Sequence, residues 1–299
     1  MRTHRAVNAA IIGCISLLLF LIIVPAAQAE IFYDVAVKGT YEDNVVGLLS
    51  DKRGGTAGMP ATTGPGPGMM GAVMVPGGPG GMGGNTPQDT GVQSKSDFSM
   101  NLFADIGGTT EIVSGTFAFL IGSAQHTFYN SFTEFDSTIG GLSAGIDKKL
   151  GDIVTARLAI NGSIKRYRDS VRDSSAFGPA VTFKEQFTPS FWLKESYYYE
   201  KNNADSALFT YKGNSVGIWA GYLVLPKTTL LLGYNYLVRD YDEPSNFQVT
   251  AQTVSAGVEQ ELAKRWFVAA QYDHQRSDSN VPGTNTTDNI VSLGLRYSY

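Results

Sequence analysis

The chain has 299 residues, of which 43% are hydrophobic and 17% charged, with 34 glycines, 12 prolines and a formal net charge of −4. This composition is too apolar for a wholly disordered chain and too rich in glycine for a helical bundle. The single cysteine excludes a disulfide framework and any multi-cysteine metal or haem site.

Residues 1–29 have the features of a secretory signal peptide. Arg2 and Arg5 precede an apolar run, Ala9–Val24, and Ala27-Gln28-Ala29 provides a small-x-small cleavage site. We expect cleavage after this site, which also removes the only cysteine. A retained membrane anchor is the alternative, because the run is close to the minimum length of a spanning helix.

From residue 30 onward, side chains alternate between apolar and polar, which predicts β-strands with one face toward hydrocarbon and one toward water. No later segment holds 18 consecutive apolar residues, which excludes a helical inner-membrane protein. The alternation is clearest in five segments: 31–42, 154–165, 216–224, 230–238 and 291–299.

A long insert, Asp51–Ser96, follows the first of these strands. Between Gly54 and Gln88 it has no charged residue, six prolines and five of the seven methionines, a composition that favours disorder. We expect an extracellular loop that folds into the lumen as a plug or docks on a surface partner. A Cu(I) site at Met69, Met70 and Met74 is a minor alternative.

Residues at the ends of the insert provide oxygen atoms suited to Ca²⁺, namely Glu42, Asp43, Asn44 and Asp97. We favour a solvated rim over a calcium site, and we expect no bound metal or cofactor.

Short and long connections alternate along the rest of the chain, as in outer-membrane barrels. We therefore predict an all-β fold for residues 30–299, a transmembrane antiparallel up-and-down barrel of about 12 strands, with ten or fourteen left open. An even count places both ends on the periplasmic side. The predicted tight turns are Gly107–Thr110, Leu150–Asp152, Thr188–Ser190, Pro226–Thr228 and Ala263–Lys264; the predicted long loops are Ser131–Ser137, Arg168–Ala176, Lys201–Asn214, Asp240–Asn246 and Gln275–Asn289.

A secreted β-sandwich is the soluble alternative, because its strands also alternate. Aromatic residues at strand ends favour the barrel, since they form girdles at the two membrane interfaces. The strand phase is ambiguous in Phe177–Phe187, Phe191–Glu200 and Gln248–Glu259, where we suspect bulges. The candidate girdle residues are Tyr33, Tyr41, Phe187, Tyr222, Tyr241, Trp266, Tyr297 and Tyr299.

The ending Val291–Tyr299 resembles the C-terminal signature of Gram-negative outer-membrane barrels, an alternating strand closed by an aromatic residue. The segment Tyr41-Glu-Asp-Asn-Val45 is similar to a Tyr-Asp-Asp-Asn-Val element of porin-like barrels, with Glu42 in place of the first Asp. The resemblance implies an outer-membrane location in contact with lipid. It also implies an assembly signal, read by the barrel-assembly machinery, at Leu293, Leu295, Tyr297 and Tyr299.

The two histidines beyond the signal peptide, His126 and His274, do not fit the patterns of barrel enzymes. Phe128 and Arg276 stand where a lipase strand would place a serine two residues after histidine. Asp273 and His274 are neighbours, so their side chains point to opposite faces. We therefore expect no catalytic residue and no enzymatic activity, and we expect an interfacial or rim position for His274.

We interpret the polar face of the strands as the lining of a pore. The leading hypothesis is a porin-like channel for passive diffusion of small hydrophilic solutes, and the alternative is a non-conducting scaffold that presents its loops to a surface polysaccharide or protein. The acidic balance and the lack of a basic patch argue against nucleic acid as a partner. The predicted pore-lining residues are Asp34, Lys38, Arg157, Asn161, Asn235, Arg239 and Arg296.

Overall fold

The computed structural model describes residues 30–45, 96–244, 246–281 and 285–299. The signal peptide, the methionines at 69, 70 and 74, and nearly all of the insert lie outside the described residues. The expectations for these segments therefore stay predictions.

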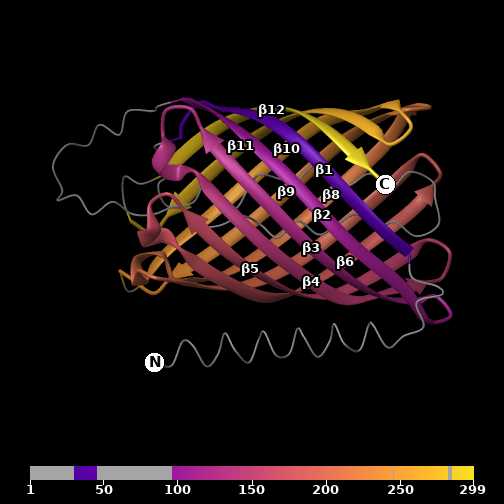
Figure 1. Cartoon of the computed structure of the whole chain (residues 1–299), viewed down its shortest axis with the longest axis horizontal. Coiled ribbons are helices and arrows are strands. Elements are labelled where there is room, and N and C mark those ends of the chain that lie inside the picture. Colours follow the sequence, from indigo (N-terminus) through magenta and orange to yellow (C-terminus); the bar gives the residue numbers. More distant parts are fainter. Residues whose placement is uncertain (1–29, 46–95, 245, 282–284) are drawn as a thin grey trace.

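The described chain forms one closed sheet in which every strand pairs with its neighbours in sequence and β1 pairs with β12 (Figure 1). All pairs are antiparallel, so the twelve-stranded up-and-down barrel is confirmed and the β-sandwich is excluded. The strands are β1 (Glu30–Glu42), β2 (Asp97–Val113), β3 (Thr116–Tyr129), β4 (Ser137–Leu150), β5 (Val154–Tyr167), β6 (Ser174–Thr188), β7 (Phe191–Ala204), β8 (Tyr211–Leu225), β9 (Thr228–Tyr241), β10 (Phe247–Ala263), β11 (Trp266–Ser279) and β12 (Thr286–Ser298).

The two ends of the barrel differ in their connections. At one end, called here the turn end, two-to-three-residue turns join the strands, and β1 begins and β12 ends there. At the other, the loop end, the connections are longer, and three of them carry 3₁₀ turns at Thr133–Phe135, Ser170–Arg172 and Ala207–Phe209. The alternation of short and long connections is thus confirmed.

The first predicted turn, Gly107–Thr110, is wrong. β2 continues through these residues to Val113, and the chain reverses at Ser114 and Gly115, where Gly115 has a φ of 71°. The glycines that suggested a turn instead lie in the sheet, where Gly107 accommodates the ring of Phe32.

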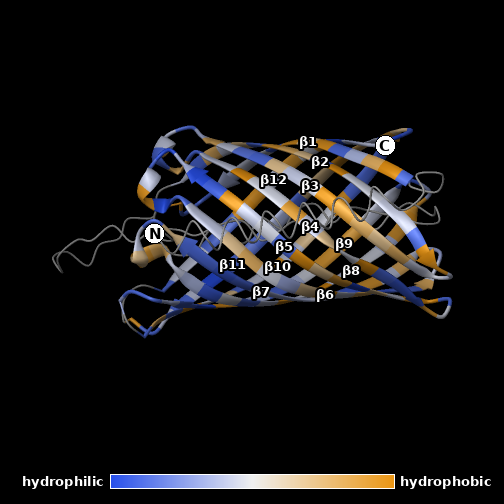
Figure 2. Cartoon of the chain, turned by 60° about the horizontal axis from the view of Figure 1, so that its bottom comes forward, coloured by the Kyte–Doolittle hydropathy of each residue, from blue (hydrophilic) through white to orange (hydrophobic). Residues whose placement is uncertain are grey.

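The outer face of the sheet is apolar over most of its height, and hydrophobic and hydrophilic residues alternate along the strands (Figure 2). Outward side chains such as Leu232, Leu293 and Ile106 are each more than 60% exposed. Such a continuous apolar surface suits a bilayer and would not be stable in water. Within the described residues, no helix has the length and apolar character needed to span a membrane.

Strand phase stays regular through Gln248–Glu259, and no bulge occurs there. In Phe177–Phe187 and Phe191–Glu200 the phase is regular except at the turn-end tips, where the register shifts between Gln186 and Thr188. In β6, Pro179 faces outward and pairs with Ile160 of β5. It has no register partner in β7, because proline lacks the N–H group that would form the hydrogen bond. The register shifts lie instead at the turn-end tips, in β2, β6, β8 and β10.

Strand β10 explains why one stretch looked irregular. Near the loop end, Phe247, Val249 and Ala251 point inward and are buried, whereas Gln248 and Gln252 point outward. Tyr241, predicted to lie in a girdle, is also buried inside, packed with Tyr211, Phe247 and Val249. The barrel wall therefore extends beyond its apolar belt at the loop end, where polar side chains take the outer face. For the same reason, the strands at this end extend into segments that the sequence analysis assigned to long loops.

Candidate pore lining

All seven predicted pore-lining residues lie on the inward face of the sheet. Lys38, Arg157, Asn161, Arg239 and Arg296 are each at most 6% exposed. They lie on four strands, β1, β5, β9 and β12, and Asp34 and Asn235 complete the set on β1 and β9. The alternation along each strand predicted that these side chains face inward, but the residues that they contact lie on other strands.

Arg296 links three strands close to the seam where the barrel closes. Its guanidinium lies 3.0 Å from the Glu259 carboxylate of β10 and 3.7 Å from the Asp34 carboxylate of β1. It also lies 4.6 Å from the ring centre of Phe267 on β11. Since Asp34 pairs in register with Asp105 of β2, three carboxylates share this side of the wall with one guanidinium.

Arg157 of β5 makes a bidentate ion pair with Asp147 of β4, at 2.7 and 2.8 Å. Both residues are buried, and the guanidinium stacks 4.2 Å from the ring centre of Phe119. Two parallel charge-assisted hydrogen bonds hold the Arg157 side chain against the wall.

Two lysines that the sequence analysis missed lie beside this pair. Lys184 of β6 and Lys194 of β7 are direct register partners, and both side chains point into the barrel. They belong to the stretches of ambiguous phase, where the inward face could not be assigned. Glu259 was missed for the same reason. Each of these strands has two possible phases, and comparing both with the charges on the neighbouring strands could have identified the inward residues.

Midway along the barrel the lining is neutral and polar. The amide group of Asn161 is fully buried, yet neither its nitrogen nor its oxygen has a hydrogen-bond partner within the described residues. The hydroxyl of Ser143, the register partner of Asn161, and the hydroxyl of Ser163 also have no hydrogen-bond partner within the described residues. Across the barrel, the Asn235 amide oxygen accepts a hydrogen bond of 2.9 Å from Ser215.

Nearer the loop end, Glu200 accepts hydrogen bonds from side chains of three strands, β5, β7 and β8. Lys165 donates at 3.3 Å, Tyr198 at 3.2 Å, and Tyr211 also donates to the same carboxylate. The Arg239 guanidinium stacks 4.8 Å from the Tyr211 ring centre. These contacts link β5, β7, β8 and β9, so Lys165 and Arg239 stabilise the barrel wall as well as line the lumen.

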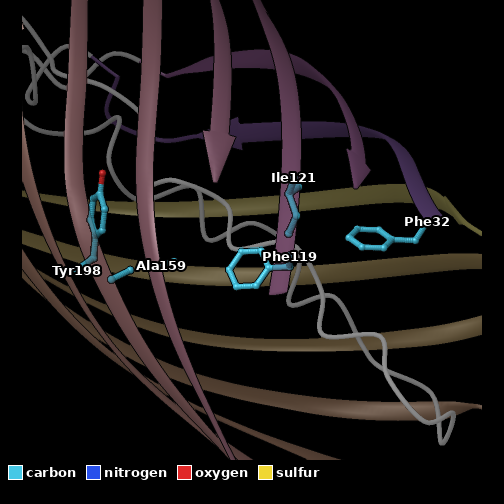
Figure 3. Close-up of a cluster of buried hydrophobic side chains, with 6 residues drawn as sticks. Phe32, Phe119, Ile121, Ala159 and Tyr198 are labelled. Carbon is cyan, nitrogen blue, oxygen red and sulfur yellow. The ribbon is translucent and has the colours of Figure 1, made fainter. Parts of the chain in front are cut away.

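Three large inward aromatic rings lie flat against the wall rather than across the lumen. A Cβ atom added at Gly221 would come 2.2 Å from the Trp192 ring, and one at Gly233 would come 2.6 Å from the Trp219 ring. Phe32 covers Gly107 in the same way; it belongs to a buried cluster with Phe119, Ile121, Ala159 and Tyr198 (Figure 3). Glycine on the adjacent strand thus provides the space that each ring occupies.

The oxygen-rich residues near the insert serve the loop end as hydrogen-bond acceptors. Asp97 accepts from the backbone N–H groups of Ser131 and Phe132, and Asp43 accepts from the backbone and amide of Asn289. No group of three histidine, cysteine or acidic side chains suited to a metal occurs in the described part of the chain.

His126, which is half-buried, and His274, which is exposed, both lie on the outer face and form hydrogen bonds with Thr138 and Asn289 respectively. Asp273 points inward, as the alternation predicted.

The comparisons with known proteins bear on the fold. No protein-family model and no curated protein matches the sequence. The structure resembles an outer membrane channel from Pseudomonas putida F1, with a TM-score of 0.54 and 7% identity over 93% of this chain and 100% of that one. It is also similar to an anion-selective porin from Comamonas acidovorans, at 0.44 and 9% identity over 91% and 99% of the two chains. At such identities the likeness extends to the outer-membrane barrel fold alone.

Proposed function

We propose that this protein is an outer-membrane porin-like channel that admits small hydrophilic solutes by passive diffusion, with no enzymatic turnover. The observation that carries the proposal is the polar, unpaired lining midway along the barrel. A buried amide with both its polar atoms unpaired is rare in proteins unless water or a ligand bonds to it. Asn161, together with Ser143 and Ser163, therefore favours a lumen that holds water or solute.

The wall chemistry supports the same conclusion. The rings of Trp192, Trp219 and Phe32 lie against glycines rather than across the lumen, and carboxylates of neighbouring strands pair with Arg157 and Arg296. Twelve strands enclose more space than the filled eight-stranded barrels and less than the sixteen-stranded porins. Selection then depends on pore radius and on the charges that line it, with Asp34, Lys38, Arg157, Asn161, Asn235, Arg239 and Arg296 among the lining residues.

The direct test is single-channel recording of the purified protein in planar bilayers. We expect stepwise conductance in KCl, with folded protein verified beforehand by a shift in electrophoretic migration between boiled and unboiled samples. A membrane that stays sealed at high loads of folded protein contradicts the channel and favours the non-conducting scaffold.

The scaffold remains the second candidate because polar side chains take the outer face of the strands at the loop end. Its partner would be a surface polysaccharide or a surface protein. Deleting residues 54–88 separates the roles of the insert: increased conductance supports a plug, whereas unchanged conductance with lost binding to cells supports docking.

The proposal also includes the outer-membrane location and the assembly signal. Leu293, Leu295 and Tyr297 lie on the outer face of β12, the strand that closes the barrel against β1, and Tyr299 directly follows it with its ring stacked on that of Tyr33. Replacing Tyr299 and Tyr297 by serine is expected to slow membrane insertion in cells while refolding in detergent is kept.

A further inference from the structure

The charged residues near the turn end are separated by sign across the lumen. On one side, Asp34, Asp105 and Glu259 come from β1, β2 and β10, and Arg296 pairs with Asp34 and Glu259. On the other side, Arg157, Lys184 and Lys194 come from β5, β6 and β7, and Asp147 of β4 pairs with Arg157. We call these sets the acidic arc and the basic arc.

The two arcs face one another because of the strand order. In a closed ring of twelve, β6 and β7 lie opposite β12 and β1. The arcs also lie at one level. The rise per residue and the register between neighbouring tilted strands give the height of each residue along the barrel axis. By this measure the six charged residues lie within roughly 7 Å of one another along the axis.

Each arc contains a pair of like charges in direct register, Asp34 with Asp105 and Lys184 with Lys194. Like charges placed opposite one another across two strands destabilise a sheet. Asp105 and Lys194 make no ion pair within the described residues, so neighbouring groups only partly offset this repulsion. The arrangement sets an electric field across the lumen, between low-dielectric walls that reduce screening.

We propose, on the basis of the channel function above, that this level of the lumen selects solutes carrying both an ammonium and a carboxylate group. Such a zwitterion lies across the field with its carboxylate toward the basic arc and its ammonium toward the acidic arc. Both of its charges then gain attraction, whereas a simple anion or cation gains one attraction and one repulsion. An uncharged solute of equal size gains neither.

The test compares two isomers of equal mass, β-alanine, which is zwitterionic, and lactamide, which is uncharged. Swelling of liposomes containing the full chain reports their entry, with protein-free liposomes as the baseline. We expect β-alanine to enter at least about twofold faster than lactamide, the size of effect that potentials of a few kT produce.

The decisive variant is Lys184→Gln with Lys194→Gln, which removes most of the basic arc. We expect the isomers to enter at nearly equal rates and the KCl reversal potential to shift toward cation selectivity. Its matched control is Lys201→Gln with Lys212→Gln, because these lysines are also direct register partners but face outward. The control should keep the preference for β-alanine.

A second variant, Asp105→Asn, tests the acidic arc and guards against misfolding of the double variant. It should lower the preference for β-alanine and shift the reversal potential toward anions. Equal entry of the two isomers through a conducting wild-type protein overturns the zwitterion proposal and leaves the channel standing. Absence of conductance and of swelling overturns both.

Discussion

Lys184 and Lys194 lie directly opposite each other across β6 and β7, with both ammonium groups turned into the barrel. Two like charges at adjacent inward positions weaken the pairing of their strands. Sheet stability alone does not account for such a pair.

Replacing Lys194 by Gln is therefore expected to stabilise the barrel, by about 0.2–1 kcal/mol, because the repulsion across the strand pair is removed. Urea titration of the detergent-refolded protein measures the change. Lys201→Gln, at the solvated outer surface, should change the stability less. A loss of stability in Lys194→Gln would show that this ammonium is bound to an anionic group of the protein.

Arg296→Gln is expected to destabilise the closed barrel, because the variant leaves the Glu259 and Asp34 carboxylates without their guanidinium. The expected loss is about 1–3 kcal/mol, between the values for exposed and fully buried pairs. The temperature at which the unboiled electrophoretic form disappears gives the readout. Arg276→Gln, which breaks the exposed pair with Asp278, is the control and should have almost no effect.

Glu195 is an exposed carboxylate on the outer face of β7, and its register partners Phe183 and Ile218 are both apolar. Charges facing lipid destabilise a barrel by about 2–4 kcal/mol for basic groups, and by less for acids. Glu195→Leu should therefore raise the free energy of unfolding in lipid vesicles by about 1–2 kcal/mol. If the substitution instead destabilises the protein, Glu195 contacts a polar partner on the outer face.

Gly233→Ala is expected to displace Trp219, because the added methyl group would overlap its ring. The ring then either strains the wall, at about 1–3 kcal/mol, or turns into the lumen and lowers the single-channel conductance. Gly140→Ala is the matched control, since nothing lies within 4 Å of the added carbon. Wild-type conductance and stability in Gly233→Ala would refute the flat packing of this ring.

Alternation of side chains predicted most of the architecture. The segments around Val291, Leu232 and Val154 showed which residues face outward, because phase is a local property of a strand. The turns at Gly151 and Lys227 and the longer loops between them gave the strand count. The inward positions of Asp34, Arg157 and Arg296 followed directly.

The local pattern failed where the outer environment changes. Gln248 and Gln252 lie above the apolar belt, so the polar face of β10 is outside there, and the sequence seems to shift phase although the strand does not. At Gly107 a glycine that makes room for a ring resembles one that makes a turn. In both cases the residue type is the same and only the tertiary surroundings differ.

By itself the sequence determined that this chain forms about twelve strands with one apolar and one polar face, and which way most of their side chains point. Only the tertiary structure decided which charges meet, joining Arg296 to Glu259 and setting Lys184 across the lumen from Asp34. The reason is that the position of one strand relative to a distant one is the sum of every intervening register, and each register is a property of a strand pair that no single segment encodes.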